Sequence, residues 1–290
     1  MNISRRTFLT TVAAAGAVAA LPAHVRSSTP SGGDVPADGL FPAKPNFHTS
    51  SQASVMISGG SITVGGKVFT DAIRAAHKLQ YGDRKKILLV LHASEPSRRD
   101  SDEKKLAELF GDDGFTVESL HHYAGRAALK KIAEAEAFFV SGGETFLLLR
   151  TLYASEQLEV LRERVLSGVP YNGTSAGANV AGPNIGCTND FPVVDVPTRL
   201  SFGLFPAVIN PHHPHSDQPD YAGRANKIRI FTRLNPAETV LGIGNGAIAR
   251  LHAGQVTIEH GPAFLYHAGG GREIEEGPVP DLTALVSKRV

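Results

Sequence analysis

The segment Lys85–Ser94, KKILLVLHAS, decides the fold, because it contains five consecutive apolar residues from Ile87 to Leu91. A run that is apolar on both faces predicts a strand covered by helices on both sides, as in a parallel sheet. Along the rest of the chain, short apolar runs alternate with segments of helical periodicity. This alternation predicts an α/β fold, with a mostly parallel sheet and helices on both of its faces.

The predicted elements follow one another in sequence. The predicted strands are Ser54–Ser58, Ile87–Leu91, Phe115–Tyr123, Ala137–Gly143, Val169–Gly173 and Pro206–His213. The predicted helices are Thr70–Gln80, Asp100–Gly111, Gly125–Ala135 and Glu156–Gly168. From about Val240 the chain has short β-like runs and closely spaced glycines, which predict a small antiparallel meander that completes the same domain.

The first 23 residues have the pattern of a twin-arginine export signal. Arg5 and Arg6 precede an apolar run from Phe8 to Leu21, and small residues suited to cleavage follow. The run is shorter than the ~20 residues of a comfortable membrane span, which disfavours an uncleaved anchor. We therefore expect a periplasmic or extracellular protein with no stable membrane span after signal removal. Residues 24–52, rich in Ser, Gly, Pro and Asp, predict a linker, and residues 53–290 a single domain.

Composition narrows the range of functions. The chain has 290 residues, a formal net charge of +1 and no Trp. It lacks a block of basic residues, so nucleic-acid binding is not predicted. A single cysteine, Cys187, cannot form an intrachain disulfide, and we expect it to be a small apolar filler rather than a nucleophile.

The stretch PYNGTSAGANVAG (170–182) carries the pattern G-x-S-x-G from Gly173 to Gly177. Two interpretations are open: a nucleophile elbow, or a turn where small residues let a helix pack on a sheet. In an elbow the turn exposes the hydroxyl of Ser175 above the end of a strand. The amide of Ala176 would then point toward the reacting carbonyl.

Two further features favour the elbow. Gly142 and Gly143 end a predicted strand, where the Gly143 amide could approach a ligand and supply a second oxyanion donor. His212 lies just beyond another predicted strand. Because open α/β sheets bind ligands at the carboxyl ends of their strands, we expect these features to meet there. The pattern predicts Ser175 as the nucleophile and His212 as its base.

The segment HHPHSD (His212–Asp217) contains residue types that bind metals. It offers His212, His213, His215 and Asp217 as ligands, but Pro214 prevents a helical arrangement of them. No second ligand group stands at a recognised spacing. We therefore expect neither a metal nor another cofactor.

Four segments resemble, in order and spacing, the motifs of the peptidase E family, the α-aspartyl dipeptidases. They are GGETF (Gly142–Phe146), GTSAGANVAGP (Gly173–Pro183), TNDFPVVD (Thr188–Asp195) and LFPAVINPHH (Leu204–His213). These enzymes are serine peptidases related to cyanophycinases. The resemblance implies a fold related to class I glutamine amidotransferases and metal-free hydrolysis of dipeptides with an N-terminal aspartate.

The resemblance also assigns roles to residues of this chain. It implies that Ser175 is the nucleophile, that His212 is the general base and that the amides of Gly143 and Ala176 form the oxyanion hole. Asp190 falls on the aspartate of the family's charge relay.

On the substrate side, the resemblance implies that a basic residue, here Arg224, holds the substrate carboxylate. Glu144 and Thr145 are expected beside the substrate.

Two departures from the family pattern leave alternatives open. Asn245 stands where family members commonly place a glutamate that orients the histidine, so either Asn245 or Asp190 could orient His212. Glu144 replaces an asparagine and adds negative charge near an acidic substrate. A cyanophycinase-like exopeptidase acting on β-aspartyl or other small peptides is therefore one alternative function. A catalytically impaired, exported binding protein is another, with Asn245 as its motivation.

Overall fold

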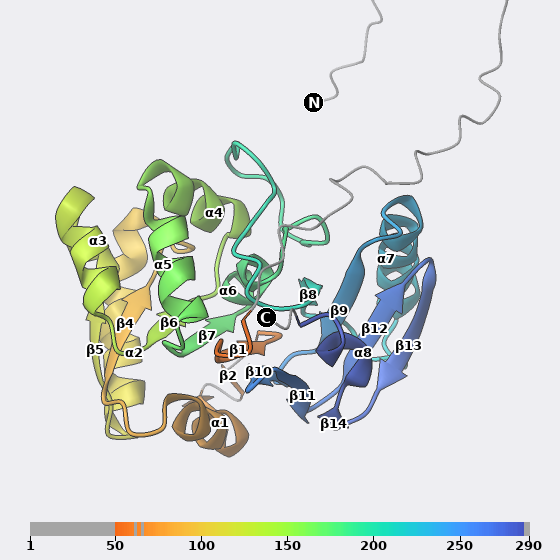
Figure 1. The fold of residues 1–290 in the computed structure, drawn as a ribbon, viewed down its shortest axis with the longest axis horizontal. Helices are drawn as coiled ribbons and strands as arrows, with labels where there is room; N and C mark the ends of the chain where they lie inside the picture. The colour runs from red at the N-terminus through yellow and green to blue at the C-terminus, as the bar shows by residue number, and fades with distance from the viewer. Residues whose placement is uncertain (1–49, 61–62, 65–66, 287–290) are drawn as a thin grey trace, which may run out of the picture. The chain divides into compact units, whose positions relative to one another are not determined.

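The computed structural model describes residues 50–60, 63–64 and 67–286. The predicted signal and most of the predicted linker lie outside the described residues. The larger of two main sheets has eight strands in the order β14-β11-β10-β1-β7-β6-β4-β5 (Figure 1). These strands are β1 (Val55–Ser58), β4 (Lys86–Val90), β5 (Thr116–Ser119), β6 (Phe138–Val140), β7 (Tyr171–Thr174), β10 (Ile248–His252), β11 (Gln255–His260) and β14 (Gly277–Pro278).

Strands β1, β7, β6, β4 and β5 are parallel, whereas β10, β11 and β14 extend the sheet antiparallel at one edge. A second sheet has the order β13-β12-β9-β8, in which only β8 and β9 are parallel. Its strands are β8 (Val208–Pro211), β9 (Thr239–Ile243), β12 (Ala263–His267) and β13 (Gly270–Ile274). Strands β2 (Thr63–Val64) and β3 (Lys67–Val68) form a separate pair.

The predicted mostly parallel α/β fold with C-terminal antiparallel strands is confirmed. The strands after Val240 do not form one continuous meander, however. They alternate between the sheets, because β10 and β11 join the larger sheet while β9, β12 and β13 belong to the smaller one.

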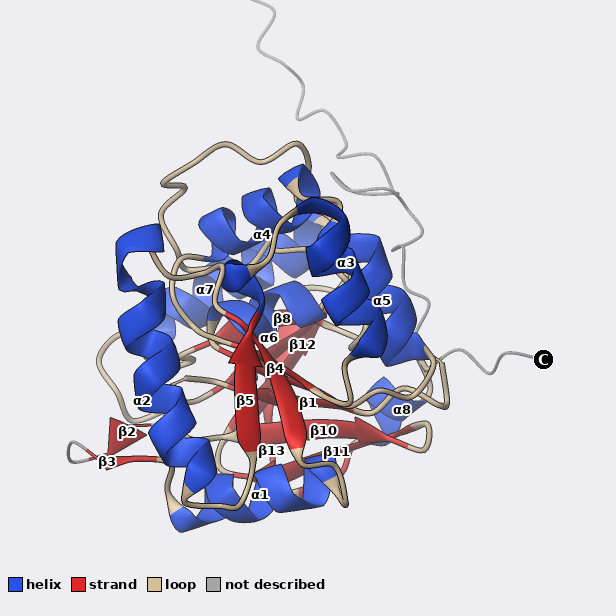
Figure 2. Cartoon of the chain, turned by 90° about the vertical axis from the view of Figure 1, so that its left-hand side faces the viewer, coloured by secondary structure: helices blue, strands red, loops and turns tan. Residues whose placement is uncertain are grey.

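Helices cover both faces of the larger sheet (Figure 2). The helices are α1 (Asp71–Tyr81), α2 (Arg99–Gly111), α3 (Gly125–Glu134), α4 (Thr145–Ala154), α5 (Gln157–Leu166), α6 (Ala176–Ala181), α7 (Tyr221–Leu234) and α8 (Pro280–Thr283), with 3₁₀ turns η1 (Pro96–Arg98) and η2 (Leu120–His122). In β4, Ile87 and Leu89 pack in one cluster with α1 and α2, and Leu88 and Val90 pack in another with α3 to α6. The apolar run is therefore buried on both faces, as predicted.

The structure differs from the sequence prediction at several elements, including the short helix α8 and the strand pair β2–β3. Helix α4 was not predicted, because Phe146, Leu148, Leu149 and Leu152 are all buried and leave little amphipathic pattern. Helix α7 was not predicted either. Of the predicted strand Phe115–Tyr123, only β5 is a strand in the structure. The next residues form η2, in which Leu120 is buried in the core.

Among the residues that the structure describes, three histidines lie in the interior. His77, His92 and His213 are 1%, 4% and 2% exposed. Burial lowers the pKa of His77 to about 3 and the pKa values of His92 and His213 to about 4. His77 packs edge-on against Phe69, with ring centroids 4.6 Å apart. These histidines are therefore neutral in the folded protein near neutral pH.

We expect the protein to lose stability as the pH falls below about 6.5, where unfolded histidines take up protons and the buried ones do not. Each buried histidine lowers the free energy of unfolding by up to about 1.4 kcal/mol for every unit by which the pH falls, until the pH reaches the pKa of that histidine in the folded protein. In thermal melts at pH 7, 6 and 5, we expect the melting temperature to fall with pH. The fall should be smaller for His77→Leu than for the wild type. The exposed control His215→Gln should keep the wild-type slope. An unchanged slope in His77→Leu would contradict the account.

Candidate active site

Ser175 lies on a sharp turn between β7 and α6, with φ 52° and ψ −108°. This region is unfavourable for a residue with a side chain. Both positions that flank the turn must be glycine, because a side chain there would collide with neighbouring backbone atoms. A Cβ atom at Gly173 would lie 2.5 Å from the carbonyl oxygen of Gly177, and one at Gly177 would lie 2.9 Å from the carbonyl carbon of Val140. The G-x-S-x-G segment thus has the geometry of a nucleophile elbow.

The Ser175 hydroxyl is the first member of a hydrogen-bonded chain of three side chains. Ser175 Oγ lies 2.7 Å from His212 Nε2, and His212 Nδ1 lies 2.6 Å from Asn245 Oδ1. If Nδ1–H donates to the amide oxygen of Asn245, Nε2 is left to accept the serine proton. This is the arrangement that a general base beside a serine nucleophile requires.

A second glycine pair, Gly59–Gly60 at the end of β1, supports the hydrogen-bonded side chains through backbone hydrogen bonds. The carbonyl of Gly59 accepts from the amide of His212 at 2.8 Å, and that of Gly60 accepts from the amide of Gly246 at 3.0 Å. A Cβ atom at Gly60 would lie 2.7 Å from each ring nitrogen of His212, at a φ of +112°. Sequence reasoning missed this pair, although it follows a predicted strand as Gly142–Gly143 does.

Asp190 lies elsewhere. Its Oδ2 accepts from the backbone amide of Thr145 at 2.8 Å, so the carboxylate caps the amino end of α4. Helix α4 begins directly after the Gly142–Gly143 turn, and the cap fixes that turn beside Ser175. Of the two residues that could orient His212, the structure brings Asn245 to the ring nitrogen.

Of the two predicted oxyanion donors, Gly143 lines the same cavity as Ser175, and Ala176 directly follows Ser175 in the chain. Gly143 has a φ of +136°, and a Cβ atom there would lie 2.8 Å from the carbonyl carbon of Ala93. The amide of Ala176 is at the first position of α6, where helix N–H groups have no intrahelical acceptor. Gly142 approaches the serine so closely that a Cβ atom there would lie 3.0 Å from Ser175 Cβ.

A cavity of about 480 Å³ opens over Ser175 and His212. Helix α2 and the segment before it form one wall, with the cations Arg98 and Lys105 and the carboxylates of Glu95 and Asp102. Glu144 lines the cavity beside Gly143. Sequence reasoning had not linked the α2 wall to the site, because nothing in the order of residues places α2 opposite the elbow.

The other two predicted substrate-binding residues lie differently. Thr145 is completely buried, and its hydroxyl accepts from the side-chain amide of Asn179 at 3.2 Å. Arg224, on α7, does not line the cavity as the described residues define it. Its guanidinium donates to Asn210 Oδ1 at 3.2 Å and to the carbonyl oxygen of His212 at 3.5 Å. Arg224 therefore contacts the turn that carries the histidine.

His213, next to His212, is a core residue. Its Nε2 lies 2.8 Å from the hydroxyl of Tyr266, and its ring stacks on Phe264. Cys187 packs near by, and burial raises the pKa of its thiol, so it is a filler as expected.

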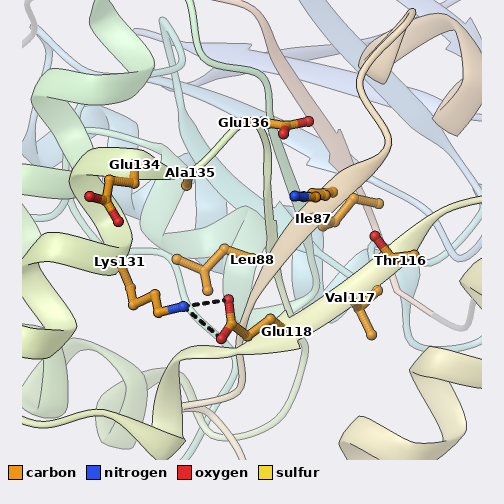
Figure 3. A pocket seen from close by; sticks show the side chains of 10 residues that line it. Ile87, Leu88, Thr116, Val117, Glu118, Lys131, Glu134, Ala135 and Glu136 are labelled. Carbon is orange, nitrogen blue, oxygen red and sulfur yellow. Dashed lines mark hydrogen bonds and ion pairs between the residues drawn. The ribbon is translucent and has the colours of Figure 1, made fainter.

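A second hollow, shown in Figure 3, lies at the amino ends of β4 and β5. Lys131 Nζ contacts the two carboxylate oxygens of Glu118 there, at 2.8 and 3.0 Å. The hollow is at the opposite end of the parallel strands from Ser175, so it does not belong to this site.

The sequence model described as "Peptidase family S51" matches residues 55–259, a span that contains the whole hydrogen-bonded chain. The chain belongs to peptidase family S51. Family S51 proteins among its relatives include peptidase E of Shewanella amazonensis, 35% identical over 185 residues, which are 63% of this chain and 78% of the relative. A Drosophila melanogaster relative named "Probable alpha-aspartyl dipeptidase" is 40% identical over 181 residues, 60% of this chain and 73% of the relative.

A solved structure has a fold similar to that of this chain. The crystal structure of a peptidase from an acI-B1 Actinobacterium superposes with a TM-score of 0.58 over 77% of this chain and 94% of its own, at 16% identity. The sequence model of the twin-arginine translocation signal matches residues 2–22, which indicates export. No helix among the described residues of this S51 peptidase is long and apolar enough to cross a bilayer.

Proposed function

We propose that this S51 peptidase is an exported enzyme that hydrolyses dipeptides with an N-terminal aspartate through an acyl-enzyme on Ser175. The observation that carries the proposal is the chain Ser175 Oγ–His212 Nε2–Asn245 Oδ1, with hydrogen bonds of 2.7 and 2.6 Å. We further propose that residues 1–23 are removed on export and that residues 24–52 link to one catalytic domain.

In the proposed reaction the Ser175 oxygen attacks the peptide carbonyl while His212 Nε2 takes the hydroxyl proton. The amides of Gly143 and Ala176 donate to the carbonyl oxygen as it becomes negative. The imidazolium then gives its proton to the leaving amine, and an acyl-serine ester remains. Water, deprotonated by His212, hydrolyses the ester and restores Ser175.

The cavity carries charges of both signs, which suits a short zwitterionic peptide. Arg98 and Lys105 can attract carboxylates, and Glu95 and Glu144 can attract an ammonium group. Arg224 remains our proposed ligand for the aspartate carboxylate, by the family resemblance. Because it contacts the His212 turn, its replacement by Gln should separate the roles: loss of binding raises KM for Asp-Leu alone, whereas a misplaced turn lowers kcat for every dipeptide.

A dipeptide panel on the mature protein tests the proposal. We expect hydrolysis of Asp-Leu, slower turnover of Ala-Leu, and no turnover of either by Ser175→Ala. Preference for β-Asp-Arg over Asp-Leu would instead favour the cyanophycinase-like alternative, which Glu144 in the cavity supports by offering a carboxylate to a basic side chain. Peptide binding without turnover at every pH would overturn the enzymatic proposal.

Asn245→Glu is expected to move the acidic limb of the kcat/KM profile to higher pH by about one unit or more. A carboxylate on Nδ1 favours the imidazolium, and the imidazolium cannot accept the serine proton. Asn245→Ala serves as the matched control, with lower activity at all pH values and an unmoved limb. Steady-state kinetics between pH 5 and 9 provide the measurement. Equal profiles for the wild type and Asn245→Glu would show that residue 245 does not act on His212.

A further inference from the structure

Four side chains capable of binding a metal converge where the first turn of α2 meets η2. They are Asp100, Glu103, His121 and His122, and their ligand atoms all lie within 4.8 Å of one another. Asp100 and Glu103 are three residues apart on α2, so they share a helix face. The segments that supply the two halves of the group are held together because α2 packs beside β5, which leads into η2 (Figure 2).

The distances within this group suit one small ion. His121 Nε2 lies 2.9 Å from Asp100 Oδ1, and His122 Nε2 lies 2.5 Å from Glu103 Oε2. His121 Nε2 is 4.0 Å from Glu103 Oε2. Tetrahedral ligands at about 2.0–2.1 Å from Zn²⁺ are about 3.3 Å apart, so rotamer adjustments of less than about 1 Å would place all four atoms around an ion.

His121 is already oriented for this role. Its Nδ1 lies 2.6 Å from the hydroxyl of Ser119, which is completely buried at the end of β5. The His121 side chain is only 9% exposed. Metal-binding histidines usually bond their second ring nitrogen to such a partner, which fixes the ring and leaves the other nitrogen for the ion.

We propose that Asp100, Glu103, His121 and His122 form a binding site for a divalent transition-metal ion, for which Zn²⁺ is the best match. Two imidazoles with two carboxylates favour such an ion over Ca²⁺ and Mg²⁺, which prefer all-oxygen ligands. The ion would link the first turn of α2 to η2. Because α2 also carries Asp102 and Lys105 on the cavity wall, and Arg98 directly precedes the helix, the ion would fix that wall while taking no part in the chemistry at Ser175.

Binding can be measured on the untagged mature protein after removal of metals with EDTA. We expect isothermal titration with ZnCl₂ to give one ion per chain, and Co²⁺ to give visible absorption bands of a tetrahedral site. Zinc should also raise the melting temperature. His121→Gln and Asp100→Asn should each weaken binding by at least about tenfold. Asp100 is 88% exposed, so its variant tests the site without a threat to folding.

Two control variants locate the ion. His215→Gln removes an exposed histidine outside the group, and His212→Gln removes the histidine in the cavity. Both should bind one Zn²⁺ as the wild type does. Wild-type affinity in both His121→Gln and Asp100→Asn would overturn the proposal, as would the absence of binding at millimolar zinc. Loss of binding in His212→Gln alone would place the ion at the catalytic serine and would also overturn it.

Discussion

Ser175→Ala is expected to lower kcat/KM for Asp-Leu by at least about 10⁴-fold, because removal of a serine nucleophile leaves only binding and the oxyanion donors. The substitution removes only one oxygen atom, at the end of β7, and relieves no steric clash. We therefore expect the melting temperature to change little. Activity and melting temperature measured on the same preparation provide the comparison.

Ser167→Ala is the matched control for this experiment. Ser167 lies at the end of α5, where its exposed hydroxyl donates to the carbonyl of Arg164 at 2.7 Å. Its replacement should leave turnover unchanged. A fluorophosphonate should label the wild type and Ser167→Ala on Ser175 and should not label Ser175→Ala. Full turnover by Ser175→Ala, or labelling at another residue, would reject the proposed nucleophile.

Gly60→Ala is expected to lower kcat by about 10²- to 10³-fold, although residue 60 has no functional group. The new Cβ atom would lie 2.7 Å from both ring nitrogens of His212, so the ring must leave its bonds to Ser175 and Asn245. A displacement of about 1 Å in a reacting group can cost 10²-fold. The rate of fluorophosphonate labelling should fall in parallel, because it depends on the same base.

Gly82→Ala separates this effect from the general cost of alanine at a positive φ. Gly82 ends α1 with a φ of +57°, and no described atom lies within 4 Å of a Cβ atom there. We expect Gly82→Ala to lose about 1 kcal/mol of stability and to keep its kcat. If Gly60→Ala turned over substrate as fast as Gly82→Ala, the proposed placement of His212 would be wrong.

Much of this arrangement could be predicted from local sequence. The apolar run of β4 specified a strand buried on both faces, and the glycines around Ser175 specified a turn that only small neighbours permit. Both signals are local, because they depend on residues that are adjacent in the chain. Helix α4 was missed for a physical reason: a helix that is buried on most sides has little amphipathic pattern.

The features that sequence did not reveal depend on contacts between distant segments. Asn245 and Asp190 were equal candidates for the partner of His212, because spacing along the chain does not say which side chain reaches a ring nitrogen. The same is true of Gly60, whose constraint comes from a histidine 152 positions later in the chain (212 − 60). His121 and His122 were read as part of a strand, and only the turn at η2 brings them to Asp100 and Glu103.

The hydrogen-bonded chain joins residues carried by both main sheets. Ser175 follows β7 of the larger sheet, His212 follows β8 of the smaller sheet, and Asn245 lies between β9 and β10, which belong to different sheets. The three side chains can therefore be hydrogen-bonded only while the ends of β7 and β8 and the segment between β9 and β10 lie together. We expect a change that displaces the smaller sheet from the larger one to break these bonds even when all three residues are intact.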